Sequence, residues 1–80
     1  MAKEYIIDWL IEALEHLGGR GSIIEICKYV WENYEQDLHN MGDIFYTWQY
    51  DIRWAATELR KRGKIKPTDM SPQGIWELSN

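Results

Sequence analysis

Residues 48–63, WQYDIRWAATELRKRG, restrict the possible folds of this chain more than any other stretch. Their apolar residues recur every three or four positions, which predicts an amphipathic helix over residues 48–62. Gly63 follows directly, and a glycine ends a helix readily because it enters the left-handed conformation at little steric cost. The side expected to be buried consists of Trp48, Ile52, Ala55 and Leu59, with Ala56 beside it.

The other sides of this helix carry polar, aromatic and basic side chains, namely Gln49, Tyr50, Arg53, Trp54, Thr57, Arg60 and Lys61. Side chains of these kinds can bind the phosphates and base edges of a nucleic acid. For Trp54 two roles stay open, packing under the C-terminal hairpin or against the connector that precedes the helix, or stacking on a base. Tyr50 is equally open between a phosphate contact and plain surface.

Two further helices are predicted ahead of this one. Residues 3–17 place apolar side chains on one side and acidic ones opposite, and two glycines then end the pattern. Residues 20–22 have room only for a short extended segment. Ser22 and Glu25 form an S-x-x-E capping box, which predicts that a second helix begins there and covers residues 23–34.

The remaining segments are expected to be a connector and a hairpin. Residues 35–47 lose the helical periodicity, with room for one short helical turn at residues 44–46, and Thr47 is a plausible N-cap for the third helix. Residues 64–79 alternate at both ends and hold two prolines and a glycine between, which predicts two strands and a turn. Two strands are not stable alone, so their apolar side chains should pack on the helices.

This order of elements is that of a winged helix-turn-helix domain. Such a domain is α+β but mostly α, with three helices, a short extended segment near residues 20–22 and a C-terminal β-hairpin called the wing. Eighty residues make one domain, here residues 1–80, and leave little room for an internal active site. Because no apolar run approaches the roughly 18 residues that cross a bilayer, we expect a soluble, cytoplasmic protein without a membrane partner.

Charge is distributed unevenly along the chain. The net charge is −4, but residues 1–51 hold three basic against ten acidic residues, and residues 52–80 hold six against three. Salt screens exposed charges beyond about 8 to 10 Å, so a phosphate would respond mainly to the basic end. The alternative is a solvated surface whose basic residues only complement the dipole of the third helix.

The residues usual in catalysis are poorly placed for it. His16, His39 and Cys27 have no spacing that forms a metal site or a Cys-His nucleophile pair. The acidic residues of the first helix, Glu12 among them, are expected to form a solvated face. We therefore expect no enzyme, no metal and no cofactor.

The run IRWAATELRKRGKIKPTDMSPQGIWELS resembles the end of the N-terminal winged-helix domain of Mrr-type restriction endonucleases. In that family an Arg-Trp pair on the third helix precedes a Leu, a Gly, a strand and a Gly-x-Trp-x-Leu hairpin. The matching residues here are Arg53, Trp54, Leu59, Gly63, Gly74, Trp76 and Leu78. LEHLGGRGSIIEICKYV is similar to the family's first turn and second helix. The resemblance implies DNA recognition beside a separate nuclease domain, for which 80 residues leave no room.

We therefore predict a module that binds double-stranded DNA with helix 48–62 in the major groove. Such a module would be the recognition domain of a restriction-type system or a small regulator. Gln49, Arg53 and Thr57 are expected to read bases, with Tyr50 next to them. Contacts to phosphates are expected from Arg60, Lys61, Lys64, Lys66 and Arg20.

The alternative prediction is a winged-helix module for protein–protein interaction or dimerisation that does not bind DNA. Its partner would be another protein, a fused nuclease domain or a second copy of the chain. The acidic helices and the five Trp residues suit such an interface. Tyr5, Trp9, Trp31 and Tyr34 are the aromatic residues whose exposure would favour it.

Overall fold

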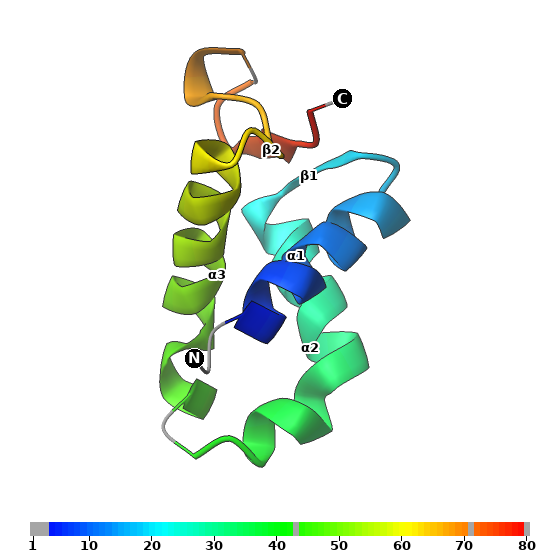
Figure 1. Cartoon of the computed structure of the whole chain (residues 1–80). Helices are drawn as coiled ribbons and strands as arrows, with labels where there is room; N and C mark the ends of the chain where they lie inside the picture. Colours follow the sequence, from blue (N-terminus) through cyan, green and yellow to red (C-terminus); the bar gives the residue numbers. More distant parts are fainter. Residues whose placement is uncertain (1–3, 43, 71, 80) are drawn as a thin grey trace.

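The computed structural model describes residues 4–42, 44–70 and 72–79. Its elements are, in order, α1 (Glu4–His16), β1 (Arg20–Ser22), α2 (Ile23–His39), α3 (Ile44–Lys61), a 3-10 turn (Thr68–Met70) and β2 (Ile75–Glu77). The three helices pack together, and the strands lie across one end of them, near the C-terminal ends of α1 and α3 (Figure 1). The fold is therefore mostly α with a small antiparallel sheet. Within the described ranges, no helix is both long enough and apolar enough to span a membrane.

The core is built on the side of α3 that the sequence marks as apolar. Trp48 is 6% exposed, while Ile52 and Leu59 are 0% and 1% exposed. These side chains pack with apolar residues of α1 and α2, namely Ile6, Ile7, Leu10, Ala13, Leu14, Ile26, Val30 and Leu38. The predicted buried side of α3 is thus confirmed.

The joint between α2 and α3 differs from the prediction. The connector expected at residues 35–47 is mostly helical, because α2 continues to His39 and α3 begins at Ile44. At Tyr34 the backbone leaves helical geometry (φ −130°, ψ 18°), so α2 bends there and then continues. Thr47 is not an N-cap, since it lies inside α3 and donates its hydroxyl hydrogen to Asp51 at 3.3 Å.

Aromatic packing explains the additional helical turns. The ring of Phe45 lies 4.4 Å from that of His39 and 6.1 Å from that of Trp31. The contact with His39 joins the last turn of α2 to the first turn of α3, and the contact with Trp31 reaches the part of α2 before its bend. They involve residues that are apart in sequence, so helical periodicity does not reveal them.

Gly63 and the capping box at Ser22 act as the sequence predicts, and Gly21 has a role that only the structure shows. Ser22 and Glu25 form both hydrogen bonds of the capping box at the start of α2. Gly63 has φ +75° and ends α3, while the N–H of Lys64 reaches back to the carbonyl of Leu59 at 2.8 Å. Gly21 is buried in β1, and a β-carbon there would lie only 2.6 Å from the Leu17 side chain. A side chain at position 21 would therefore force the end of the Leu17 side chain, just after α1, to shift.

The C-terminal segment is less regular than a two-stranded hairpin. β2 pairs with β1 instead, with Gly21 opposite Trp76, and Ile65 forms only a single bridge with Leu78. Residues 64–66 are therefore not a regular strand, which corrects the prediction for the first half of the hairpin. Ile65 is 1% exposed, and Trp76 and Leu78 pack against the core, as expected.

A polar contact that the sequence did not reveal joins α1 to α2. The carboxylate of Glu12 accepts hydrogen bonds from the hydroxyls of Tyr29, at 2.6 Å, and of Tyr34. The ring of Tyr34 also stacks on Trp9, with the centroids 4.2 Å apart. Glu12 is therefore not part of a purely solvated acidic face.

These hydrogen bonds shift the pKa values of both partners. Those from Tyr29 and Tyr34 lower the pKa of Glu12 below its ordinary 4.5, and the bond to Glu12, with burial, raises the pKa of Tyr34 from 10.0 to about 12. A carboxylate with a lowered pKa stabilises the fold above its ordinary pKa and loses that effect as pH falls through the folded value. A phenol with a raised pKa stabilises the fold below 10.0 and loses that effect as pH rises toward about 12.

Tyr34→Phe removes one hydroxyl and keeps the ring on Trp9. We expect the free energy of unfolding to fall by about 1 kcal/mol at neutral pH, the usual net value of one hydrogen bond. The difference between the two proteins should shrink in acid, as Glu12 becomes protonated. Urea unfolding at several pH values below and above 4.5 measures it. A difference that does not change with pH would contradict this assignment.

Candidate nucleic-acid interface

One exposed stripe runs along α3, on the side opposite the core. Its residues recur every three or four positions and are Tyr46, Tyr50, Arg53, Thr57 and Lys61. Gln49 is exposed beside them. We call these six residues the α3 stripe. It offers phenol, amide, hydroxyl and cationic groups to the solvent on a rigid helix.

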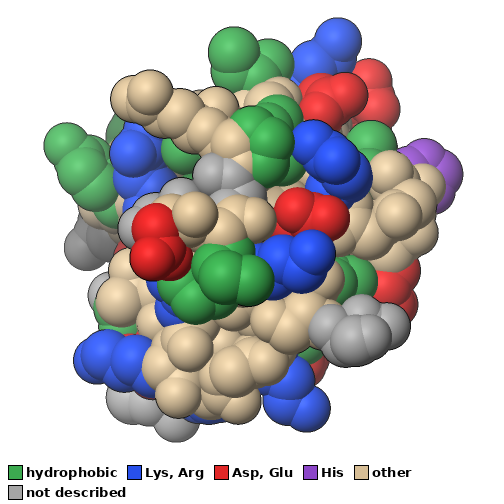
Figure 2. Space-filling view, turned by 90° about the horizontal axis from the view of Figure 1, so that it is seen from above, with side chains coloured by type: hydrophobic (Ala, Val, Ile, Leu, Met, Phe, Trp, Pro, Cys, Tyr) green, Lys and Arg blue, Asp and Glu red, His purple; other side chains and the backbone are tan. Residues whose placement is uncertain are grey.

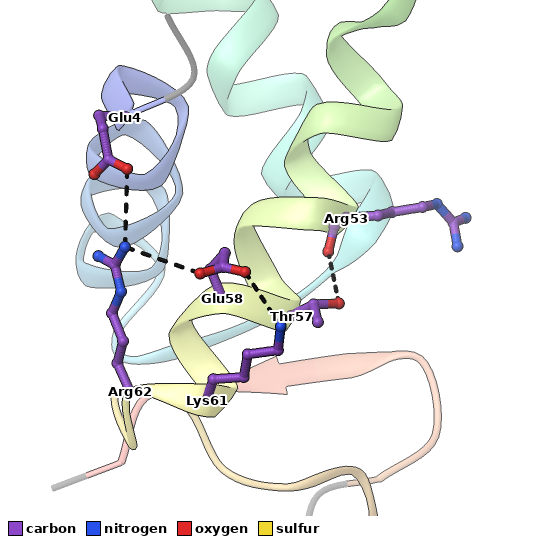
Figure 3. A network of polar contacts seen from close by, with 6 residues as sticks. All are labelled: Glu4, Arg53, Thr57, Glu58, Lys61 and Arg62. Carbon is purple, nitrogen blue, oxygen red and sulfur yellow. Dashed lines mark hydrogen bonds and ion pairs between the residues drawn. The ribbon is translucent and has the colours of Figure 1, made fainter. Parts of the chain in front are cut away.

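Arg53 of α3 and Arg62, which directly follows α3, point in different directions. Arg53 extends away from α1 (Figure 3) and is exposed. Arg62 turns toward α1, where its guanidinium lies 3.8 Å from Glu4 and 4.0 Å from Glu58. Thr57, next to Arg53 on the stripe, bonds its hydroxyl back to the Arg53 carbonyl at 3.3 Å. Arg53 is therefore the arginine best placed to contact a ligand.

Three of the other predicted phosphate contacts lie elsewhere. Arg20, Lys64 and Lys66 line a hollow of about 630 Å³ at the sheet end of the molecule. The same hollow is lined by Ile11 and Glu15 of α1, so it opens beside α1 and not beside the α3 stripe. The structure thus divides the predicted contacts between two surfaces.

Several of the basic side chains have acidic neighbours. Lys66 lies 3.3 Å from Glu77, and Lys61 lies 3.5 Å from Glu58. Arg60 is only partly exposed, and its Nε atom is buried without a hydrogen-bond partner within the described residues. Figure 2, which views the sheet end, shows Lys and Arg side chains spread over that end with Asp and Glu side chains among them. The basic end is therefore not one continuous positive patch.

Tyr46 is the stripe residue that the sequence prediction missed. It was assigned to the connector, yet α3 begins at Ile44, which places Tyr46 one turn before Tyr50. The two side chains are 82% and 77% exposed. The four-residue spacing between Tyr46 and Tyr50 is the sequence pattern that could have placed both on one side of a helix.

The aromatic residues whose exposure would favour the protein-interaction alternative are partly buried. Tyr5, Trp9, Trp31 and Tyr34 are partly buried against the core. Trp9 lies between Tyr5 and Tyr34, with ring centroids 4.9 and 4.2 Å away. Trp54 is also partly buried against the core, which is consistent with its packing role.

An apolar groove lies between α2 and α3, beside the stripe. Its volume is about 620 Å³, and Ile23, Ile24, Cys27, Trp31 and Trp48 form most of its wall. Ile24 is 72% exposed at its edge. Isolated exposed apolar residues are common, but one that borders an apolar groove suits a protein contact.

The thiol of Cys27, which lines this groove, is disfavoured in its charged form by burial. Burial raises the pKa of its thiol above the ordinary 9.0, although the positive charge of Arg53 acts in the opposite direction. In the described part of the chain, no group of three His, Cys, Asp or Glu side chains could hold a metal ion.

We expect the Cys27 thiol to react with a disulfide reagent at neutral pH about tenfold more slowly in the folded protein than in urea, because both burial and the raised pKa reduce the accessible thiolate. The rate should rise with pH through and beyond 9.0. Spectrophotometric detection of the released thiol follows the reaction. Faster labelling of the folded chain would show an activated thiol instead.

The chain matches no protein-family model, no curated protein and no solved structure. What it binds must therefore be inferred from its own residues and their geometry.

Proposed function

We propose that this chain is a winged helix-turn-helix domain that binds double-stranded DNA through the α3 stripe. The observation that carries the proposal is the division of α3 into a fully buried apolar side and an exposed side with Gln49, Arg53 and Thr57 at its middle. A rigid helix with such an exposed side can enter the major groove, where Gln pairs well with adenine and Arg with guanine.

The order of the extended segments supports the winged-helix assignment. β2 lies between β1 on one side and the bridge at Ile65 on the other. In a winged helix the strand after the first helix pairs with the last strand, and the last strand pairs with the strand after the third helix. We also propose that the chain is related to the N-terminal domain of Mrr-type endonucleases. Its role would then be DNA recognition beside a nuclease domain, or that of a small regulator.

The charges favour weak, local attraction to DNA. Arg53 and Lys61 are exposed on the stripe, but Lys61 lies 3.5 Å from Glu58, and Arg62 and Lys66 also lie within 4.0 Å of carboxylates. With the net charge at −4, repulsion from the acidic helices opposes binding at low salt. Added salt screens both this repulsion and the attraction between the exposed cations and the phosphates. Because few cations are exposed on the stripe, we expect few phosphate contacts and a shallow dependence of affinity on salt.

Duplex binding, measured by fluorescence anisotropy from about 50 mM salt upward, tests the proposal. Arg53→Ala should weaken binding by about 1 to 3 kcal/mol if Arg53 pairs with a base. Lys61→Ala should reduce the slope of log affinity against log salt by about 0.9, the loss of one phosphate contact.

Arg62→Ala is the matched control, because it removes the same charge as Arg53→Ala from the residue that directly follows α3, on the side that faces α1. It should affect binding far less. Equal losses from the two changes would mean that only net charge matters, and no duplex binding by the unmodified chain would refute the proposal.

The alternative is a protein-interaction module, and the groove between α2 and α3 favours it. Ile24→Asp would then abolish self-association or capture of a partner, because a charge at the groove edge opposes burial. Met70→Asp is the control, since Met70 is also exposed, at 66%, but does not line the groove. Sedimentation over a wide range of concentration reads the result. A monomer at every concentration would remove the homodimer form of this alternative.

A further inference from the structure

The α3 stripe is chemically divided along its length. Its basic residues, Arg53 and Lys61, lie in the C-terminal half, and residues 44–52 contain no Lys or Arg. The N-terminal half presents only neutral donors, of which Tyr46 lies farthest out. A phosphate next to this half would meet hydroxyl and amide groups and no cation.

The length of the stripe decides which residues approach the DNA backbone. At 1.5 Å per residue, Tyr46 lies about 10 Å from Arg53 along the axis of α3, and Lys61 lies about 12 Å from Arg53 in the other direction. The major groove is about 12 Å wide and winds around the duplex, so a straight helix faces bases only near its middle. With Arg53 at the bases, the two ends of the stripe pass over opposite phosphate strands.

Tyr46 is suited to such a contact. Its side chain is 82% exposed, and its hydroxyl makes no hydrogen bond within the described residues. Its ring meets Phe45 edge-on, with the centroids 5.3 Å apart, and Phe45 is itself stacked on His39. The ring therefore rests against a packed aromatic cluster, which reduces the ordering that a contact would require.

We propose that Tyr46 donates its phenolic hydrogen to a phosphate of one DNA strand, while Lys61 holds a phosphate of the other. The inference rests on the DNA binding proposed above. It gives the complex an asymmetric grip, with a neutral hydrogen bond on one strand and an ionic contact on the other. The two contacts differ in their dependence on salt, because only the cation displaces a counterion when it binds.

The test compares Tyr46→Phe, Lys61→Ala and the unmodified chain by fluorescence anisotropy on one duplex over a range of salt. Tyr46→Phe should weaken binding about fivefold at every salt concentration, with an unchanged slope. Lys61→Ala should lower the slope by about 0.9. Tyr29→Phe is the matched control, since it removes the same atom from a tyrosine that faces Glu12 on α1.

Thermal unfolding of Tyr46→Phe should match that of the unmodified chain, because the missing hydroxyl belongs to an exposed side chain and bonds to none of the described residues. If the unmodified chain binds duplex and Tyr46→Phe binds equally well, the inference is wrong and the proposed DNA binding stands. A lower slope or a lower unfolding temperature for Tyr46→Phe would also overturn it. If the unmodified chain does not bind, both proposals fail.

Discussion

Burial of the apolar side of α3 fixes the orientation of the other elements in this small domain. Ile52 and Leu59 are at most 1% exposed, and they contact both other helices through a shared core. Because a helix repeats every 3.6 residues, burying these positions turns Tyr50, Arg53 and Thr57 toward the solvent. Any rotation of α3 that exposed other residues would bring polar groups into the core, at a cost of several kcal/mol. The exposed stripe is thus a direct consequence of core packing.

Two further contacts hold the frame around α3. On one side, Glu12 ties α1 to α2 through two tyrosine hydroxyls, and Tyr34 at the bend of α2 also stacks on Trp9. At the sheet end, Gly21 allows β1 to pass close over Leu17 and pair with β2. The pairing of β1 with β2 joins the segment between α1 and α2 to the C-terminal segment that follows α3. Contacts from both sides of α3 in the sequence therefore hold its position.

Ion pairs reduce what the basic end can offer to a ligand. The sequence places six cations between positions 52 and 68, but Arg62 and Lys66 lie beside carboxylates and Arg60 is partly enclosed. Exposed pairs of this kind are worth little to stability, yet each one lowers the local positive potential. The other three cations are exposed, namely Arg53 and Lys61 on the α3 stripe, with Lys61 3.5 Å from Glu58, and Lys64 by the sheet. They lie on different surfaces. Because the exposed cations are separated, we expect a small contact between α3 and DNA, and no broad electrostatic surface.

Local patterns along the chain correctly indicate the buried side of each helix, the capping box at Ser22 and the stop at Gly63, because these depend on neighbours within one or two turns. They do not indicate where α2 and α3 meet, since that joint depends on Phe45 packing against aromatic residues of α2. For the same reason only the folded chain shows that Tyr46 continues the stripe. The surface to which each cation belongs is also decided by folding, because partners such as Glu4 and Arg62 lie 58 positions apart in the sequence.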